Sequence, residues 1–346
     1  MSHPRMYLEK FRKRSFRFLL CQFCEFAAAA ALLLCSCDKL TGVKPKGLRV
    51  GFAQIANEGP WRETNTKSIK KEARKRNIEL DFPELKDSKL KGGQQQPFQK
   101  AALLSFIKKK VDVIAFSPVV EDGWNDVLKE AKAENIPVIT SDRGVSENDE
   151  SLVATFIGSD FTEEGRRAAD WLCKAFSQSN EIANILEVQG TRDSAPAIQR
   201  HLGFVAILSK PECQERLQII ESVVGNFNRE EAEKVTTTFL NNGGSNRINA
   251  VFAHSDAMAF GAIKALKKAG LNPGCQITVV SVDATDKGCN KIRKGRLNCA
   301  VECKSRLGVQ LFDAAEAAAK SMALPARIII AEGVYDCSNV DHCGHD

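Results

Sequence analysis

From Leu48 onward, the chain alternates between short apolar runs and longer stretches whose apolar positions recur with helical spacing. Apolar runs of about four to eight residues, rich in β-branched side chains, are typical of buried strands. Ten strands are predicted in this way: Leu48–Ile55, Ile78–Phe82, Val111–Phe116, Ile136–Thr140, Val153–Ile157, Ile182–Val188, Leu217–Ser222, Ile248–Ala253, Ile277–Val282 and Leu297–Val301.

Amphipathic helical patterns lie between these strands. The predicted helices are Trp61–Arg76, Gln99–Lys110, Trp124–Asn135, Glu163–Phe176, Ala197–Leu208, Arg229–Leu240 and Ala257–Ala269. Strands that alternate with helices build parallel sheets, which helices cover on both faces. The strands fall into two sets, and we therefore predict an α/β protein with two doubly wound parallel-sheet lobes.

Polar side chains follow the predicted strands in both sets. In open α/β sheets, ligands bind in the crevice at the carboxyl ends of the strands. The residues at these positions are Asn57-Glu58, Trp61-Arg62, Ser117-Pro118, Asp142-Arg143, Gln189-Gly190-Thr191, His254-Ser255-Asp256 and Asp283. Because both sets supply such residues, we expect a polar cleft between the two lobes.

The residue types in this cleft suit a small sugar. Asp, Asn and Arg hold donors and acceptors in fixed directions, as the hydroxyls of a sugar require. Trp61, Trp124 and Phe227 are available to cover the apolar face of a sugar ring, while core or rim packing is the alternative for each tryptophan. The alternative for Asp142 and Arg143 is an exposed loop ion pair, worth about 0–1 kcal/mol.

The first residues have the pattern of an export signal. Six basic residues between Arg5 and Arg17 precede the apolar run Phe26–Leu34 and the tetrapeptide Leu34-Cys35-Ser36-Cys37. This order predicts a signal peptide over residues 1–36, since the apolar run is too short to span a bilayer of about 30 Å. The tetrapeptide resembles a bacterial lipobox, so we expect lipidation of Cys37 and a tether over residues 37–47; secretion with a cut nearby is the alternative.

The net charge argues against a nucleic-acid partner, and the chain length indicates the number of domains. The formal net charge of +6 falls to +2 without residues 1–36, which is too small an excess to predict nucleic-acid binding. We interpret the Lys-rich stretch Lys67–Arg76 as the solvated face of a helix. The remaining 310 residues are enough for about two domains.

Eight cysteines lie in the second half of the chain: Cys173, Cys213, Cys275, Cys289, Cys299, Cys303, Cys337 and Cys343. An even number in an exported protein predicts disulfides, at least two here, although the sequence leaves their pairing open. The alternative is a metal site in the tail Cys337–His345. Its spacings match no zinc pattern, and we expect neither a metal nor a cofactor.

A series of motifs resembles the sugar-binding proteins of the ribose/galactofuranose type, receptors of ABC importers. In chain order they are Val50-Gly51-Phe52-Ala53-Gln54, Gly59-Pro60-Trp61-Arg62, Gln94-Gln95, Ser117-Pro118-Val119-Val120, Gly123-Trp124, Val127–Lys132, Ile136-Pro137-Val138, Asp142-Arg143, Val188-Gln189-Gly190-Thr191, Gly203-Phe204, Gly225-Asn226-Phe227, Ala253-His254-Ser255-Asp256, Asp283 and Ala300-Val301-Glu302. The resemblance covers about residues 48–325.

The resemblance implies a type I periplasmic binding protein fold, with chain crossings near residues 158, 302 and 325. The first lobe would contain residues 48–157 and 303–325, and the second lobe residues 158–302 and 326–346. The ligand would be a galactofuranose- or pentose-like sugar, passed by a monomeric, lipid-anchored receptor to an importer permease. The implied ligand residues are Trp61, Arg62, Asp142, Arg143, Thr191, Phe227, Asp256, Asp283 and Glu302.

Three departures from the family pattern leave the identity of the sugar open. Ser255 stands where Asn is usual, and Ala284 stands where Gly commonly follows the aspartate. Ribose receptors carry a ligand-binding Arg near Ile198; the nearest here is Arg200, which we expect to point elsewhere.

Other functions are less well supported. Asp283 and Glu302 could form the acid pair of a glycoside-processing enzyme, but no hydrolase motif accompanies them. A transcriptional repressor with the same sensor fold would need an N-terminal helix-turn-helix, where this chain has an export signal. A receptor that reports sugar to a membrane signalling kinase stays an open alternative.

Overall fold

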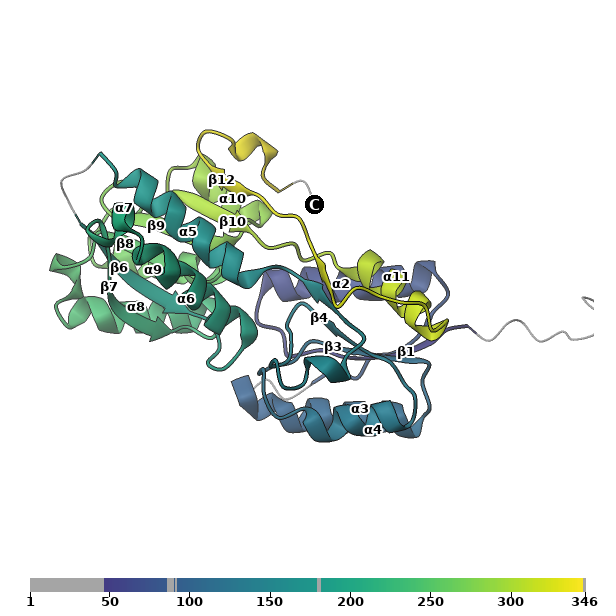
Figure 1. Cartoon of the computed structure of the whole chain (residues 1–346). Helices are drawn as coiled ribbons and strands as arrows, with labels where there is room; N and C mark the ends of the chain where they lie inside the picture. Colours follow the sequence, from purple (N-terminus) through teal and green to yellow (C-terminus); the bar gives the residue numbers. More distant parts are fainter. Residues whose placement is uncertain (1–46, 86–89, 91, 179–181, 345–346) are drawn as a thin grey trace, which may run out of the picture. The chain divides into compact units, whose positions relative to one another are not determined.

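A computed structural model describes residues 47–85, 90, 92–178 and 182–344. Its strands form two six-stranded sheets (Figure 1). In spatial order, the first sheet contains β11 (Arg327–Ile329), β5 (Thr155–Gly158), β4 (Val138–Ser141), β3 (Val113–Phe116), β1 (Arg49–Ala53) and β2 (Glu79–Asp81). The second contains β12 (Val334–Asp336), β10 (Cys299–Glu302), β9 (Thr278–Asp283), β8 (Ala250–Ala253), β6 (Ala183–Gln189) and β7 (Leu217–Val224).

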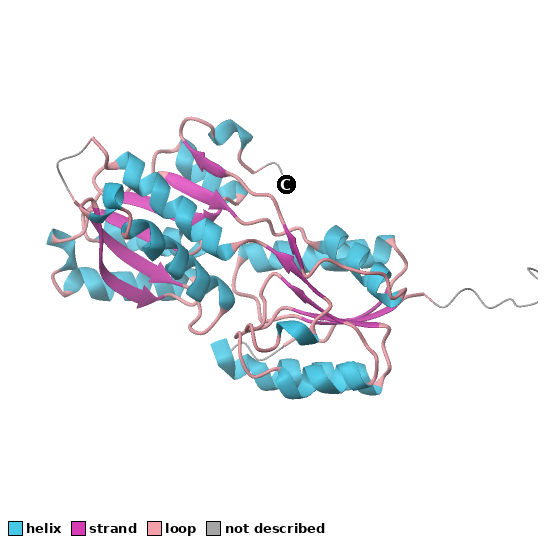
Figure 2. Cartoon of the chain, viewed as in Figure 1, coloured by secondary structure: helices cyan, strands magenta, loops and turns pink. Residues whose placement is uncertain are grey.

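Helices cover both faces of the first sheet (Figure 2). One face packs against α2 (Pro60–Lys75) and α11 (Gly308–Ala319), and the other against α3 (Gln96–Lys108) and α4 (Asn125–Ala133). All four residues of β3 are buried, because apolar side chains meet it from both layers. This explains why the strands are continuous apolar runs rather than alternating ones.

The second sheet is covered in the same way. Its two faces carry α5 (Phe161–Ala175), α6 (Ala195–Leu208) and the short α7 (Pro211–Gln214) on one side, and α8 (Arg229–Asn241), α9 (Asp256–Lys268) and α10 (Asp286–Arg293) on the other. The helices α5 and α6 approach closely at Gly203, where a Cβ atom would lie only 1.9 Å from the carbonyl oxygen of Thr162. Short 3₁₀ turns complete the elements: η2 (Gly92–Gln95), η3 (Glu150–Leu152), η4 (Gly244–Asn246) and η5 (Val340–His342).

The predicted doubly wound α/β class is confirmed, and each of the ten predicted strands is present. Two edge strands were not predicted. β11 pairs parallel with β5 in the first sheet, whereas β12 pairs antiparallel with β10, so the second sheet is not wholly parallel. Each is only three residues long, although β11 overlaps the apolar run Ile328–Ile330.

The chain crosses between the sheets three times. We call residues 159–160 the first crossing, residues 303–307 the second and residues 330–333 the third. The first two lie where the sequence predicted them. The third was expected near residue 325, and this is wrong because β11 still belongs to the first sheet.

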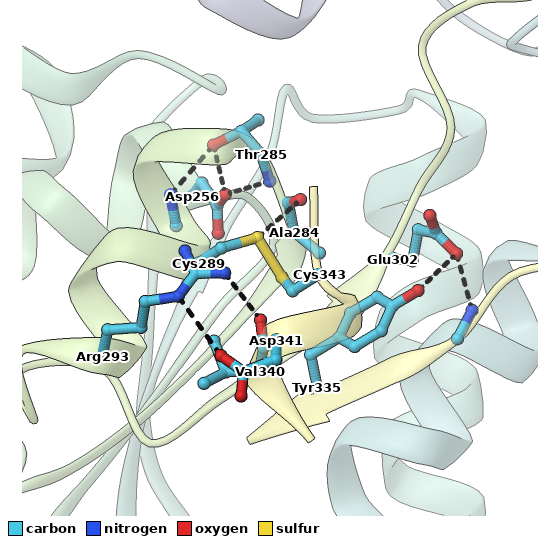
Figure 3. The surroundings of a disulfide bond; sticks show 12 residues. Asp256, Ala284, Thr285, Cys289, Arg293, Glu302, Tyr335, Val340, Asp341 and Cys343 are labelled. Atoms are coloured by element: carbon cyan, nitrogen blue, oxygen red, sulfur yellow. Dashed lines mark hydrogen bonds and ion pairs between the residues drawn. A yellow bond between two sulfur atoms is a disulfide. The ribbon is translucent and has the colours of Figure 1, made fainter. Parts of the chain in front are cut away.

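Two cysteine pairs lie at disulfide distance, both on the second sheet's side of the chain. Cys173 in α5 pairs with Cys213 in α7, and Cys289 in α10 pairs with Cys343 in the tail, as Figure 3 shows. Their Cα atoms are 5.5 and 5.8 Å apart, within the usual range of about 4.4–6.8 Å. Of the two tail thiols considered as metal ligands, Cys343 is thus engaged elsewhere, whereas Cys337 is free and exposed.

The predicted signal peptide and Cys37 lie outside the described residues. Among the residues that the structure does describe, no helix combines the length and apolar character needed to cross a bilayer.

Candidate functional site

A cavity with about 780 Å³ of space, including its open mouth, lies between the carboxyl ends of the two sheets. The segments after β1 and β4 contribute its first wall, which contains Glu58, Trp61, Arg62, Asp142 and Arg143. The second wall contains Arg200, Phe227, Asp256, Asp283 and Lys287. The polar cleft predicted from the strand ends is therefore present, and residues of both sheets line it.

The first wall is built from two buried ion pairs. Arg62 Nη2 donates to Asp142 Oδ2 at 2.5 Å, and Arg143 Nη2 donates to Glu58 Oε2 at 2.6 Å. Ser117 Oγ also donates to Asp142 Oδ2 at 3.0 Å. These partners hold the carboxylates and guanidinium groups in fixed directions before any ligand is present, and the exposed loop pair considered for Asp142 and Arg143 is excluded by their burial.

Burial changes the electrostatic environment of Arg143. Desolvation lowers the pKa of Arg143 from its ordinary value, while the charges of Glu58 and Asp142 oppose this shift. A guanidinium that is only 2% exposed gains most from further acceptors, because water cannot supply them. The site is therefore prepared to donate to a polar ligand.

The second wall contains two neighbouring carboxylates. Asp256 Oδ1 accepts from Ser281 Oγ at 2.6 Å, and Asp256 Oδ2 accepts from the backbone N–H and the hydroxyl of Thr285 at 2.8 and 2.6 Å (Figure 3). Asp283 Oδ2 accepts from the backbone N–H of Asp256 at 3.2 Å. Asp256 thus accepts three hydrogen bonds from β9 and the segment that follows it, whereas Asp283 has the freer acceptor.

Both aspartates hold their protons more tightly than usual. Burial raises the pKa of Asp256 to about 6. Burial, together with the nearby charge of Asp256, raises the pKa of Asp283 well above its ordinary value. The second wall therefore differs from the first, in which every carboxylate faces a cation.

Arg200 lines the cavity, so the expectation that it points elsewhere is wrong. Its Nε donates to Glu164 Oε2 at 2.7 Å, and its Nη1 donates to the carbonyl oxygen of His254 at 2.6 Å. The guanidinium carbon lies 5.9 Å from the ring centroid of Phe227. A signal was available in the sequence, because Ala197, Arg200, Phe204 and Ile207 are spaced to share the buried face of α6.

The aromatic candidates divide into two groups. Trp61 and Phe227 line the cavity, where Trp61 Nε1 donates to the carbonyl oxygen of Cys303 at 2.7 Å. The guanidinium of Arg143 lies 5.1 Å from the Phe227 ring centroid. Trp124 is fully buried, packs edge-to-face on Phe116 and is a core residue.

Two predicted ligand residues do not line the cavity. Glu302 Oε2 accepts from the backbone N–H of Gly333 at 2.8 Å and from the Tyr335 hydroxyl at 3.5 Å (Figure 3). Its carboxylate supports β12 and lies off the cavity wall, which corrects the expectation for Glu302. Thr191 Oγ1 donates to Glu58 Oε1 at 3.3 Å, so Thr191 reaches the site only through Glu58.

The motif His254-Ser255-Asp256 has a structural role in addition to its place on the wall. Ser255 Oγ accepts from the backbone N–H of Met258 at 3.2 Å and caps α9, a role that Asn would fill equally well. His254 Nε2 lies 3.0 Å from the buried carboxylate of Glu187, and burial lowers the pKa of His254. This contact anchors the strand end that carries the site.

One group of metal-ligand type occurs in the part of the chain that the structure describes. Glu164, Cys303 and Glu332 each place one ligand atom within 4.8 Å of the others. Burial and the charge of Glu164 raise the pKa of Glu332 to about 8, and burial raises that of the Cys303 thiol.

Comparison with known proteins agrees with this architecture. A family model described as a periplasmic binding protein domain matches residues 50–323. The galactofuranose-binding protein YtfQ of Escherichia coli is 37% identical over 82% of this chain and 86% of that protein. A Mycobacterium smegmatis crystal structure in complex with β-D-fucofuranose has a TM-score of 0.79 and 38% identity, covering 86% of this chain and 93% of that one. The binding protein of the arabinose ABC transporter from Shewanella sp. ANA-3, bound to α- and β-L-arabinofuranose, has a TM-score of 0.76 and 36% identity, covering 85% and 93%.

Proposed function

The chain belongs to the periplasmic binding protein family, and from this premise we propose that it binds one small sugar in furanose form and delivers it to an ABC importer. The observation that carries this proposal is the cavity between the sheets, to which both sheets contribute charged and aromatic side chains. Such a cavity offers hydrogen-bonding groups for hydroxyls and ring faces for C–H groups. The furanose ligands of the similar proteins support the ring form.

The proposed roles of the residues follow from their partners. Arg143 and Asp142 donate to and accept from sugar hydroxyls on the first wall, with Arg62 and Glu58 holding them in place. Arg62 is also the residue by which the sequence resembles the galactofuranose-like branch. Trp61 contributes an apolar ring on the same wall.

On the second wall, Asp283 is the main acceptor and Arg200 the main donor. Phe227 packs against the ring of the sugar, and Asp256 positions Thr285 and the backbone next to Asp283. Neither Glu302 nor Thr191 contacts the ligand directly in this proposal.

We propose two lobes, one of residues 48–158 with 303–329 and one of residues 159–302 with 330–346. Their relative movement at the three crossings opens and closes the cavity. The sugar favours the closed state because only that state lets it contact both walls at once. The receptor acts as a monomer and holds the ligand without chemical change.

Membrane attachment through a lipid on Cys37 is also proposed, supported by the basic segment, the apolar run and the lipobox-like tetrapeptide. Cys37→Ala should release the protein from membranes or block its processing. Mass spectrometry of the mature N-terminus checks this, and an unmodified N-terminus at another residue would contradict it.

A thermal-shift screen of the mature protein against L-arabinose, D-galactose, D-fucose, D-ribose and D-fructose tests the sugar proposal. A ligand at about a hundredfold excess over its dissociation constant stabilises the protein by about 2.7 kcal/mol. Calorimetry on each hit should give one sugar per chain, with preference for sugars that populate furanose forms. If no sugar shifts the transition, the proposed function is wrong.

A further inference from the structure

The three crossings meet at a small polar cluster formed by Ser159, Glu164, Cys303 and Glu332. Ser159 lies in the first crossing, and Glu164 follows in the first turn of α5. Cys303 opens the second crossing, and Glu332 lies in the third. Residues far apart in the sequence thus place a thiol and two carboxylates within 4.8 Å of one another.

The contacts inside the cluster leave acceptor capacity unused. Ser159 Oγ donates to Glu332 Oε1 at 2.6 Å and lies 3.4 Å from Cys303 Sγ. Glu164 Oε2 accepts from Arg200, whereas the buried Glu164 Oε1 meets no donor in good hydrogen-bond geometry, and the donor next to Glu164 is the weakly donating Cys303 thiol. A buried carboxylate oxygen without a partner is costly, and native structures generally satisfy such atoms.

A second cavity reaches the cluster from outside. It has about 660 Å³ of space, including its open side, and Glu164, Arg167 and Glu332 are among the residues that line it. An ion could therefore reach these carboxylates without passing through the sugar cavity.

We propose that Glu164, Cys303 and Glu332 form a binding site for a thiophilic divalent cation of the zinc class, with Ser159 beside it. One thiolate and two carboxylates are ligands that zinc accepts, whereas calcium and magnesium prefer all-oxygen sites. Any proton on the Cys303 thiol or on the Glu332 carboxyl group is released to solvent when the cation binds. The complex of a dication with three anionic ligands carries one negative charge, which the neighbouring Arg200 guanidinium balances.

A cation at this place would join the three crossings through their own side chains. Two of its ligand residues also contact residues that line the sugar cavity. The carbonyl oxygen of Cys303 accepts from Trp61 Nε1, and Glu164 accepts from Arg200. Cation and sugar should therefore alter each other's affinity by the same factor, as linkage requires. The cation site itself does not depend on which sugar binds.

Cobalt(II) provides the probe, because a cobalt–thiolate bond gives a charge-transfer absorption that oxygen ligands do not. We expect the non-reduced mature protein to bind one equivalent with this absorption, and zinc to displace it. Cys303→Ser should abolish the band. Cys337→Ser and Cys275→Ser, which change the exposed free thiols, should leave it intact.

Glu332→Gln is a second variant at a partly exposed position, and it keeps the test decisive if Cys303→Ser does not fold. We expect it to weaken cobalt binding about tenfold or more, in line with the loss of a metal-binding group. A parent protein without the band, or a band that persists in folded Cys303→Ser, would overturn the proposal. Sugar titrations with and without zinc then report the linkage separately, so failure of the sugar proposal would leave the cobalt result unaffected.

Discussion

The two walls of the cavity bury their charged side chains in different ways. On the first wall, Asp142 and Glu58 each form an ion pair with an arginine. On the second wall, Asp256 and Asp283 lie next to each other, and their pKa values rise because burial outweighs the hydrogen bonds and, for Asp283, the charge of Arg200 that oppose the shift. The carboxylates of the first wall are thus paired with arginines, whereas Asp283 on the second wall can accept further hydrogen bonds from a ligand.

The regions around the walls differ as well. Residues 48–157 contain no cysteine, whereas both disulfide pairs lie on the side of the second sheet. We infer that the ion pairs maintain the shape and stability of the first wall, whereas the two cysteine pairs stabilise the region that carries the second wall. This difference can be tested by substitutions on each side.

The largest effect is expected for the first wall. Asp142→Ala and Arg143→Ala should each weaken sugar binding by about 2–5 kcal/mol, because each leaves a buried charged partner without its counterpart. This corresponds to a factor of about thirty to several thousand in affinity by calorimetry. For the same reason both variants should also unfold at lower denaturant concentration, since breaking a buried pair is strongly destabilising.

Lys100→Ala is the matched control, because it breaks the exposed pair between Lys100 and Asp126. It should change neither affinity nor stability by more than about 1 kcal/mol. Affinities within about threefold of the parent for both first-wall variants, a difference of less than about 0.7 kcal/mol, would show that the site is misplaced.

The disulfides should matter next. The double change Cys289→Ala and Cys343→Ala removes the bond that ties the tail to α10, and should lower the free energy of unfolding by about 2–4 kcal/mol. Sugar affinity should change little, since neither residue lines the cavity. Thiol counting on the denatured, non-reduced mature protein should find four free cysteines beyond Cys37. Finding eight would contradict both pairings.

Asp283→Asn probes the acceptor on the second wall. The change replaces an acceptor oxygen with an amide donor and leaves a sugar hydroxyl without its acceptor, so sugar binding should weaken by about 1–3 kcal/mol, or roughly 5- to 150-fold. The stability of Asp283→Asn, in contrast, should increase relative to that of the parent. The folded protein raises the pKa of Asp283, so ionising this group costs stability as the pH rises above its unfolded pKa of about 3.9.

The Asn variant lacks this cost, and urea unfolding should show it gaining on the parent as the pH rises from about 4 toward neutrality. If the variant instead loses stability relative to the parent over this range, the carboxylate is paired in a way that the present contacts do not include. Asp283 would then be paired like the carboxylates of the first wall, and the proposed difference between the two walls would be wrong.

The smallest effect is expected for Glu302→Gln. Its carboxylate accepts from Gly333 and Tyr335 and does not reach the cavity, so sugar affinity should stay within about threefold of the parent, a change below about 0.7 kcal/mol. A loss of sugar affinity as large as that of Asp283→Asn would show that Glu302 contacts the sugar.

The sequence predicted those features that depend on local pattern. Most of the ten predicted strands were found because burial on both faces makes them continuous apolar runs, as in β3. The cleft was found because polar residues follow strands in both sets. The resemblance supplied Asp142, Arg143 and Asp283, which line the cavity.

What the sequence missed depends on partners that are distant along the chain. Glu302 was assigned to the ligand, but Gly333 in the third crossing and Tyr335 in the unpredicted strand β12 supply its hydrogen-bonding partners. Arg200 was thought to point away, although it shares the buried face of α6. A resemblance gives residue identity, whereas the direction of a side chain also depends on its neighbours in space.

The place of β11 has a consequence for the order in which the protein folds. Although β1 to β5 come first in the chain, the first sheet gains its edge strand Arg327–Ile329 and its covering helix α11 only from the last quarter of the sequence. Residues 161–302 likewise contain five of the six strands of the second sheet in one stretch, and its edge strand β12 comes later still. Closing long loops slows the pairing of distant segments. We therefore expect the first five strands of each sheet to pair early, with β11, α11 and β12 added only after nearly the whole chain is available.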